Sequence, residues 1–195
     1  MYILPKRECF FMRYCSNCGS RVTSRIPKGD DRERYVCDNC RMIHYQNPKV
    51  VVGCIPEYEK EILLCKRSIE PRYGFWTVPA GFLENGETVS DGAKREALEE
   101  AIARVEILGL FTVFNLTDIN QVYLIFRSRL LDRNFGVGEE SLEVKLYKED
   151  DIPWEVIAFR PIKESLRLYF KDRKKGHFPL HMGRITFSQG IVLEM

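Results

Sequence analysis

Four cysteines near the start of the chain constrain its fold more than any other feature. Cys15 and Cys18 form one Cys-x-x-Cys pair, Cys37 and Cys40 form a second, and eighteen residues separate the pairs. This spacing is typical of a zinc site in which each pair lies on a tight turn and the two turns surround one ion. Because four cysteines leave no open coordination position, we expect a structural Zn²⁺ that stabilises a small zinc ribbon over residues 1–46.

Two disulfides or a set of reduced surface thiols are the alternatives for these cysteines. The first residues, MYILPKRECFF, lack a continuous apolar run and a cleavage site, so we expect no secretory signal. The longest apolar stretch, VVVGCI, is too short to cross a bilayer, and we expect a cytoplasmic protein, in which metal binding is favoured over disulfides. His44 is expected to be an ordinary turn residue, and Cys54 and Cys65 to be small core residues.

Length and charge narrow the remaining possibilities. The 195 residues suit one ordinary domain plus a small module, and a net charge of +2 gives no general reason to expect nucleic-acid or membrane binding. The first module does combine basic residues and tyrosines: Tyr14, Arg21, Arg25, Lys28, Arg32, Arg34, Tyr35 and Arg41. Four interspersed acids dilute this charge, so we expect the module to pack against the rest of the chain or a second subunit, and RNA contact is the weaker alternative.

After Asn47-Pro48 the sequence alternates between strand and helix patterns. Strands are predicted at 49–58, 61–67, 104–115, 121–131 and 141–149, and helices at 88–101 and from Pro161 onward. Thr88 or Ser90 is expected to cap the first helix. The resulting division is a ribbon at 1–46, an α/β domain at 47–175 and a C-terminal extension at 176–195.

The helix at 88–101 carries a second metal motif. Its residues are Gly81, Glu87, Arg95, Glu96, Glu99 and Glu100, with five residues between Gly81 and Glu87 and seven between Glu87 and Arg95. Glu96 and Glu100 share one helix face, which Glu99 borders, and an apolar stripe of alanines is expected on the opposite face. The repulsion among these acids predicts a site for Mg²⁺ or Mn²⁺, and a solvated acidic face is the alternative.

These residues resemble the signature of the Nudix hydrolases, G-x5-E-x7-R-E-U-x-E-E-x-G-U, in which U is a bulky apolar residue. The segments YCSNCG, NPKVVVGCIPEY, GFWTVPAGFLENGET, ESLEVKLY and AFRPIKESLRLYF extend the resemblance over nearly the whole chain, to zinc-ribbon Nudix proteins that hydrolyse ADP-ribose and FAD. The resemblance implies an α/β/α sandwich with a mixed sheet and a homodimer. It also implies hydrolysis of a nucleotide substrate to AMP plus ribose 5-phosphate, or to AMP plus FMN.

The resemblance also implies roles for individual residues. Glu96 and Glu100 are expected to be the main ligands of the catalytic ion, with Glu99 as a third ligand and the carbonyl of Ala80 completing the set. From the residues themselves, Arg95 and Glu87 are expected to form an ion pair that fixes the loop against the helix.

The resemblance further implies that a glutamate from a later loop acts as the base or as a further ligand, and a solvated acidic loop is the plain alternative. Glu140 is favoured, with Glu139 and Glu143 as alternatives, and Gly136 and Gly138 predict a mobile loop before them.

Five residues are candidates for substrate contact: Arg67 and Arg72 for the diphosphate, and Trp76, Phe82 and Tyr123 for stacking on a base or flavin ring. Surface arginines and core aromatics are the plain alternatives for these positions.

The chain departs from the signature at Ala97, Ile102 and Ala103. Ile102 replaces a glycine that would let the chain leave the helix through a left-handed turn. Because that conformation is costly for isoleucine, we expect the helix to continue through Ala103 or to end without that turn, with Ile102 buried against the following strand. NADH pyrophosphatase activity remains an alternative, although the chain lacks the Ser-Gln-Pro-Trp-Pro-Phe-Pro-x-Ser array of those enzymes. A non-catalytic ligand sensor is a further alternative.

Overall fold

The chain forms two compact units that meet at Asn47-Pro48. The computed structural model describes residues 12–186 and 190–194. In the first unit, called the ribbon unit, β1 (Val22–Arg25), β2 (Arg34–Cys37) and β3 (Ile43–His44) form an antiparallel sheet in that order. Each Cys-x-x-Cys turn is followed by a residue with positive φ, Gly19 at 72° and Arg41 at 60°.

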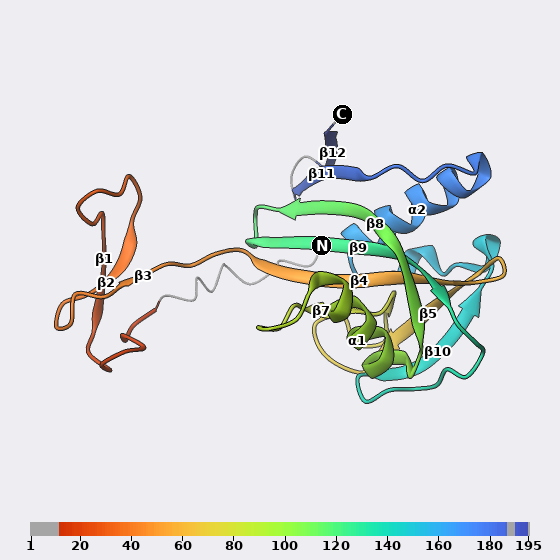
Figure 1. Cartoon of the computed structure of the whole chain (residues 1–195), viewed down its shortest axis with the longest axis horizontal. Coiled ribbons are helices and arrows are strands. Elements are labelled where there is room, and N and C mark those ends of the chain that lie inside the picture. Colours follow the sequence, from red (N-terminus) through yellow and green to blue (C-terminus); the bar gives the residue numbers. More distant parts are fainter. Residues whose placement is uncertain (1–11, 187–189, 195) are drawn as a thin grey trace. The chain divides into compact units, whose positions relative to one another are not determined.

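The second unit, called the catalytic unit, is built on a mixed sheet (Figure 1). Its strands are β4 (Lys49–Tyr58), β5 (Glu61–Arg67), β6 (Trp76–Thr77), β7 (Ala80–Phe82), β8 (Val105–Leu116), β9 (Gln121–Leu130), β10 (Ser141–Tyr147), β11 (His181–Thr186) and β12 (Gly190–Glu194). The order is β10-β5-β4-β9-β8-β11-β12, with β6 paired to β5 and β7 to β4. The β4–β9 and β8–β11 pairs are parallel, and the others are antiparallel. The sequence predicted β4 and β5 to the residue, whereas it gave no sign of β11 and β12.

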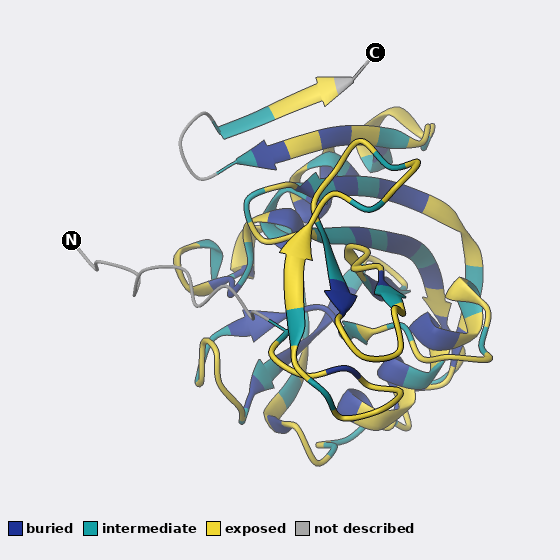
Figure 2. Ribbon diagram, turned by 90° about the vertical axis from the view of Figure 1, so that its left-hand side faces the viewer, coloured by how far each residue is buried: buried dark blue, intermediate teal, exposed yellow. Residues whose placement is uncertain are grey.

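Two helices, α1 (Val89–Ala101) and α2 (Arg160–Lys175), cover opposite faces of this sheet. Ile125 and Phe126 are neighbours on β9 and therefore point to opposite faces. Ile125 belongs to the same core cluster as Leu166 of α2, and Phe126 to the same cluster as Ala97 of α1. Figure 2 shows the buried residues concentrated between these layers. The prediction of an α/β/α sandwich with a mixed sheet, which follows a zinc ribbon in the chain, is thus confirmed.

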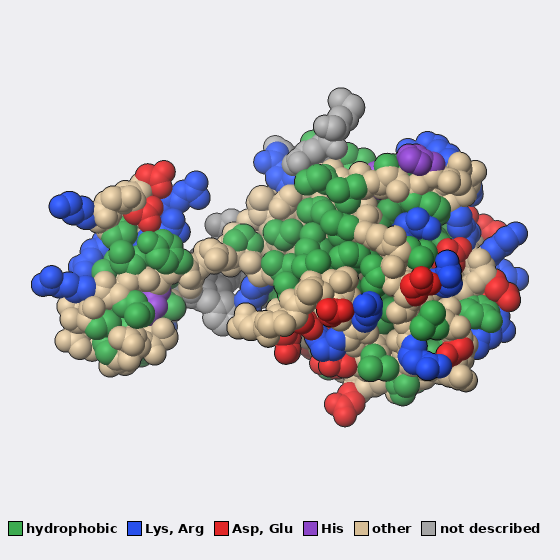
Figure 3. Space-filling model, viewed as in Figure 1, with side chains coloured by type: hydrophobic (Ala, Val, Ile, Leu, Met, Phe, Trp, Pro, Cys, Tyr) green, Lys and Arg blue, Asp and Glu red, His purple; other side chains and the backbone are tan. Residues whose placement is uncertain are grey.

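The two short Cys54 and Cys65 side chains lie in the core next to α1, as predicted. On the face that carries α1, apolar side chains also reach the surface beyond the helix (Figure 3). Met182 pairs with Val113, and Val113 with Leu124, so these three lie on that face. Met182 is 40% exposed, which leaves part of the sheet open to solvent. No helix among the described residues is long and apolar enough to cross a membrane.

Helix α1 packs through its alanines and its acids together. Thr88 caps its first turn by accepting the N–H of Asp91 at 3.2 Å. Ala93 and Ala97 are fully buried, and Glu96 and Glu100, predicted on the opposite face, are also buried at 7% and 4% exposure. The prediction of opposite faces is wrong because these positions follow one another within about 100° around the helix. The acids therefore lie at the border between the core and the site.

The predicted exit of α1 is also wrong. Ile102 has φ 51° and ψ 25°, the left-handed conformation, and is half exposed. Its N–H donates to the carbonyl of Leu98 at 2.9 Å, and the N–H of Ala103 donates to that of Ala97 at 3.0 Å. The first of these bonds, from the N–H of the left-handed residue to the carbonyl four residues earlier, is that of the αL motif, and both donors serve carbonyls left free by the helix end. Ala103, at 1% exposure, provides the burial that was expected of Ile102.

Ile102→Gly is expected to raise the free energy of unfolding by up to about 1 kcal/mol, because the left-handed conformation costs a non-glycine residue about that much. Urea unfolding followed by tryptophan fluorescence measures the change, since both tryptophans lie in the catalytic unit. Ile102→Ala is the control because it shortens the side chain and keeps the strain. An equal gain in both variants would contradict the conformational explanation.

Candidate active site and metal sites

The four cysteines of the ribbon unit converge as the sequence predicts. Their Sγ atoms all lie within 4.8 Å of one another, with Cys15 to Cys40 at 3.6 Å and Cys18 to Cys37 at 3.4 Å. A zinc tetrahedron with Zn–S bonds of about 2.3 Å places its sulfurs roughly 3.8 Å apart. The arrangement therefore fits a four-coordinate Zn²⁺ and, because these distances far exceed an S–S bond, not disulfides.

His44 has a more specific place than the turn position expected from the sequence. It lies on β3, is 8% exposed, and its Nε2 is 3.3 Å from the Sγ of Cys15. With Nε2 protonated, the ring would donate to the thiolate of Cys15 and orient it, in a site whose four ligands would be the cysteines. The prediction of an ordinary turn residue is wrong, because strand pairing with Tyr35 points His44 at the cysteines.

Arg95 is the centre of the polar network on α1. It forms a two-point ion pair with Glu87, with Nε to Oε2 at 3.0 Å and one guanidinium N–H to Oε1 at 2.8 Å. The other arm donates to Glu96 at 2.7 Å and to Glu99 at 2.9 Å. A further N–H reaches the carbonyl of Phe82 at 3.1 Å, which fastens the loop before the helix to the helix itself.

Glu87→Gln should cost stability in a pH-dependent way. The Arg95 guanidinium lowers the pKa of the Glu87 carboxyl from 4.5 to about 2. A lowered folded-state pKa contributes stability that is present above pH 4.5 and is lost as the pH falls towards 2. The wild type should therefore be more stable than the variant at neutral pH, and the gap in urea midpoint should close in acid. A gap that stayed constant with pH would contradict the ion pair.

Glu100 is the most deeply buried acid of the motif. Its Oε2 accepts the N–H of Ala80 at 3.2 Å, which ties β7 to the last turn of α1. Burial, followed by the charge of Glu96, raises the pKa of the Glu100 carboxyl to about 8. Burial likewise raises the pKa of Glu96. Two buried carboxyls that resist ionisation together are suited to a site that a cation completes.

The first glycine of the motif is required by this packing. A Cβ on Gly81 would lie 2.4 Å from Oε1 of Glu96, so a side chain at this position would displace the carboxylate. The spacing in the sequence indicated that this glycine matters, and the contact supplies the reason. The loop can approach the acidic face only where it has no side chain.

The segment predicted to be a mobile loop is instead fastened to the end of α1. The N–H of Gly136 donates to Ala101 at 2.8 Å and that of Gly138 to Glu100 at 3.2 Å. Ser141 Oγ also donates to the carbonyl of Glu100, at 2.7 Å. Mobility was the wrong inference from the two glycines, because their small size serves this close approach. Ser141 is a positioning residue that the sequence did not reveal.

Gly138→Ala is expected to destabilise the catalytic unit by about 2–3 kcal/mol, as overpacking of a tight contact does. The added Cβ would lie only 1.8 Å from the carbonyl oxygen of Glu99, which forces the loop away from the helix. Gly136→Ala is a matched control, since its nearest neighbour would be a side-chain atom of Ile102 at 3.4 Å. Equal urea midpoints for the two variants would contradict this close approach.

Among the three later glutamates, Glu140 is associated electrostatically with the acidic site. Its charge contributes to the raised pKa of both Glu96 and Glu100. Its backbone is held by Ser68, whose N–H donates to the Glu140 carbonyl at 2.9 Å. Glu143 instead lies 3.9 Å from the ammonium of Lys66 on the neighbouring strand. No feature of the sequence around Ser68 indicated this tether.

The candidate substrate arginines differ in their surroundings. Arg67 is 7% exposed, donates to the carbonyl of Pro71 at 3.0 Å and lies 5.0 Å over the Phe159 ring. Its charge acts on Glu100, where it opposes the rise in pKa. Arg72 is exposed and lies over Phe75 at 5.4 Å, in a left-handed conformation with φ 71°. Arg67 is thus the arginine whose charge acts on an acid of the motif.

The three candidate aromatics also differ in their surroundings: two are buried in the core, and the third is half exposed. Trp76 and Tyr123 are each 7% exposed and belong to the core, where Trp76 meets Tyr147 edge-on at 5.1 Å. Their placement favours the core alternative over stacking on a ligand. Phe82 is 49% exposed, and the Lys49 ammonium lies over its ring at 5.0 Å.

The carboxylates fit a hard divalent cation by their chemistry. Glu96, Glu99 and Glu100 offer only oxygen ligands, the set preferred by Mg²⁺ and Mn²⁺. Among the described residues, the cysteines alone form a group whose ligand atoms all lie within 4.8 Å. One guanidinium nitrogen of Arg95 lies within hydrogen-bond distance of both Glu96 and Glu99, at 2.7 and 2.9 Å.

Comparison with known proteins agrees with this geometry. The family model described as NUDIX domain matches residues 47–168, and the model described as Nudix N-terminal matches residues 13–46. A crystal structure of a NUDIX hydrolase from Nitrosomonas europaea has a TM-score of 0.87 and 55% sequence identity, and the alignment covers 90% of this chain and 99% of that one.

Two curated relatives extend the comparison. The ADP-ribose pyrophosphatase of Methanocaldococcus jannaschii is 28% identical over 139 residues, which are 69% of this chain and 78% of that protein. The NAD-capped RNA hydrolase NudC of Vibrio parahaemolyticus is 34% identical over 102 residues, which are 51% of this chain and only 36% of that protein. Because the NUDIX model spans well over half of the chain, this protein belongs to the Nudix family and is a Nudix hydrolase.

Proposed function

We propose that this enzyme hydrolyses the diphosphate linkage of a nucleoside diphosphate derivative, with ADP-ribose as the first candidate substrate and FAD as the second. The observation that carries the proposal is the acidic face of α1, on which Arg95 holds Glu96 and Glu99 and the N–H of Ala80 holds Glu100. The relative named ADP-ribose pyrophosphatase supports the choice of ADP-ribose. The products would be AMP and ribose 5-phosphate, or AMP and FMN.

Glu96, Glu99 and Glu100, with the carbonyl of Ala80, would hold the Mg²⁺ or Mn²⁺ on which the reaction depends. Such an ion, when bound, neutralises diphosphate oxygens and lowers the pKa of water. The chain's contribution is to keep the carboxylates in register: Arg95 orients Glu96 and Glu99, and the N–H of Ala80 orients Glu100.

Other residues would act on the substrate directly. Glu140 would accept the proton of the attacking water, a role that suits an exposed carboxylate beside an acidic site. Arg67 would bind the diphosphate, because its charge acts on Glu100 and its Nε is already fixed by Pro71. Phe82, which is half exposed, would stack on a ring of the substrate.

An AMP-release assay tests this proposal. ADP-ribose, FAD and NADH are each incubated with Mg²⁺ and with Mn²⁺, using the wild type and the double variant Glu99→Gln/Glu100→Gln. Metal-dependent release of AMP by the wild type alone is expected. Absence of metal-dependent release from all three compounds, or equal release by the double variant, would defeat the proposal.

NADH pyrophosphatase or NAD-cap hydrolysis is the second candidate. It is favoured by the relatives named NAD-capped RNA hydrolase, although the chain covers about a third of the length of the one from Vibrio parahaemolyticus. A faster release of AMP from NADH or from a NAD-capped oligonucleotide than from ADP-ribose would select this function.

Two alternatives of another class receive less support. A non-catalytic sensor would not need its acids, yet the motif retains all four glutamates. RNA binding by the ribbon unit is opposed by ion pairs that neutralise two of its cations: Arg25 with Asp38 at 2.9 Å and Arg34 with Asp30 at 2.9 Å.

Sedimentation of the full chain would test the homodimer that we also propose, for which the apolar sheet face around Met182 offers a surface.

A further inference from the structure

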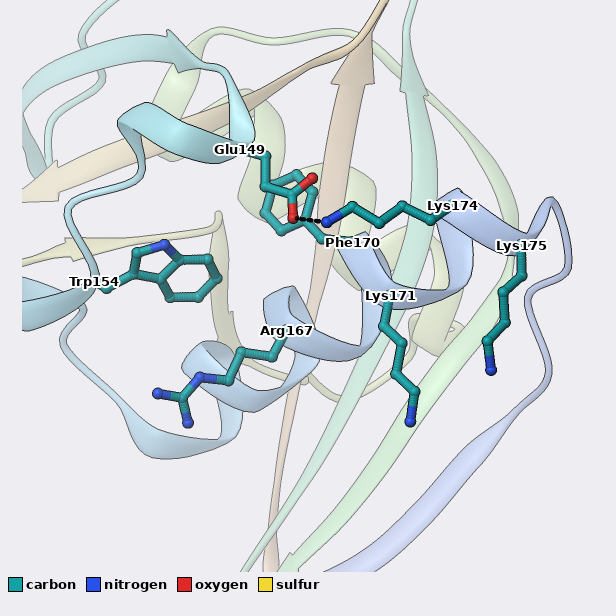
Figure 4. A pocket seen from close by; sticks show the side chains of 7 residues that line it. All are labelled: Glu149, Trp154, Arg167, Phe170, Lys171, Lys174 and Lys175. Atoms are coloured by element: carbon teal, nitrogen blue, oxygen red, sulfur yellow. Dashed lines mark hydrogen bonds and ion pairs between the residues drawn. The ribbon is translucent and has the colours of Figure 1, made fainter.

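A basic and aromatic pocket lies on the outer side of α2. Its volume is about 460 Å³, within the range of small-molecule sites. It is lined by Glu149, Trp154, Arg167, Phe170, Lys171, Lys174 and Lys175 (Figure 4). Glu149 comes from the 3-10 turn Glu149–Asp151, Trp154 from the turn Trp154–Val156, and the others from α2.

This pocket is separate from the acidic site. Phe170, which closes its inner side, is packed in the core between α2 and the sheet. The carboxylates of the acidic site are on α1, which covers the other face of that sheet. A ligand in the pocket would therefore not contact the catalytic residues.

The charge of the pocket is concentrated along one helix stripe. Arg167, Lys171, Lys174 and Lys175 follow the i, i+4, i+7, i+8 pattern of a single face and are all exposed. Arg167 pairs with Glu164 at 2.7 Å, and Glu149, the carboxylate that lines the pocket, pairs with Lys174 at 2.6 Å and with Arg173 at 3.6 Å. Within the part of the chain that the structure describes, Lys171 and Lys175 have no ion-pair partner, and Figure 4 shows them extending side by side.

Compensation of the helix dipole explains only part of this arrangement. The last turn of α2 contains Arg173, Lys174 and Lys175, where cations are stabilised by the helix end. Arg167 and Lys171 lie one to two turns earlier, beyond the range of that effect. The whole-chain net charge of +2 conceals this local excess of positive charge.

An aromatic ring completes the pocket. Trp154 is half-buried and is braced by Phe170, whose ring lies 6.1 Å away at an interplanar angle of 74°. The guanidinium of Arg167 lies 5.9 Å from the Trp154 ring. A fixed indole beside several cations is the combination that binds a flat base together with its phosphate.

We propose that this pocket binds a nucleotide, with the phosphate held by Lys171 and Lys175 and the base stacked on Trp154. The same chemistry is offered by a free nucleotide and by one unit of a single-stranded RNA. The site is independent of the proposed hydrolysis, because none of its residues belongs to the acidic site.

Fluorescence titration of the full chain with uridine monophosphate, and with a short single-stranded oligouridylate, tests this proposal. Both ligands should quench the emission of Trp154, and Trp154→Phe should abolish the change. Lys171→Ala/Lys175→Ala should weaken binding by about tenfold and flatten its salt dependence, as expected when phosphate contacts are lost. Arg104→Ala/Arg129→Ala removes the same charge from exposed ion pairs elsewhere and should leave binding unchanged.

Glu149→Gln provides a variant with the opposite expected result. It removes the one carboxylate of the pocket and releases Lys174, so binding should tighten by several-fold. Much tighter binding of the oligouridylate than of the mononucleotide would identify an RNA strand as the source, and equal affinities would identify free nucleotide. The proposal would be overturned if the affinity measured by quenching were the same in the Lys171→Ala/Lys175→Ala and Glu149→Gln variants as in the wild type, or if neither ligand quenched the emission.

Discussion

Glu100→Gln is expected to lower kcat for the preferred substrate on the order of 10³-fold, because the loss of a charged ligand removes several kcal/mol of charge stabilisation in the transition state. The fold should be unaffected. Burial raises the pKa of this carboxyl to about 8, so in the metal-free protein at neutral pH it is already mostly protonated. Glutamine has nearly the same shape as the neutral acid and can still accept the N–H of Ala80.

The measurement pairs steady-state kinetics in Mn²⁺ with urea unfolding of the metal-free protein. Glu106→Gln is a matched control, since Glu106 is a glutamate on β8 that pairs with Arg129 at the surface. Near wild-type kcat for Glu100→Gln at saturating Mn²⁺ would show that Glu100 does not hold the catalytic ion. A large loss of stability in the metal-free variant would contradict the protonated state of this carboxyl.

Removal of zinc should unfold the ribbon unit and leave the catalytic unit folded. Apart from Cys15 and Cys37, Val36 is the only hydrophobic residue buried in the described part of the ribbon unit, too little for a core of its own. The free energy of zinc binding, on the order of 10 kcal/mol for such sites, must therefore supply the stability. The catalytic unit has two core clusters that contain no ribbon residue.

Cys37→Ser tests this expectation, with Ser16→Ala in the first Cys-x-x-Cys turn as the control. The first variant should lose zinc and the amide protection of β1 and β2 in hydrogen exchange, and the second should keep both. Tryptophan fluorescence should report the same urea midpoint for all three proteins, because Trp76 and Trp154 both lie in the catalytic unit. Retained protection without zinc would contradict a structural role for the metal.

The sequence predicted the elements best where the determinants are local. The turn at Glu59 separates two apolar runs, so the bounds of β4 and β5 followed directly from the pattern. The caps of α1 show the contrast. Thr88 acts through its own helix turn, whereas the end at Ile102 depends on bonds from Gly136, Gly138 and Ser141, more than thirty residues away.

The site shows the same division between local and distant determinants. The sequence spacing was enough to predict that Glu87, Arg95 and Glu96 lie close together, because all three belong to one loop and the helix that follows it. The tether of Glu140 by Ser68 joins segments that pair only through β5 and β10, and no local pattern encodes it. The sequence predicted Trp76 and Tyr123 as possible ligand contacts, because the type of a residue does not show whether its side chain points into the core or towards a ligand.

Because of Arg95, we expect the two metal sites to differ in how much the folding of their unit depends on the ion. In the ribbon unit, we expect the loss of the ion to unfold the structure. In the catalytic unit, the guanidinium already lies 2.7 Å from Glu96 and 2.9 Å from Glu99, and the acids are balanced before any divalent cation arrives. We therefore expect the catalytic unit to stay folded when the divalent cation is withdrawn, so that the supply of this cation would limit the enzyme's rate and not its stability.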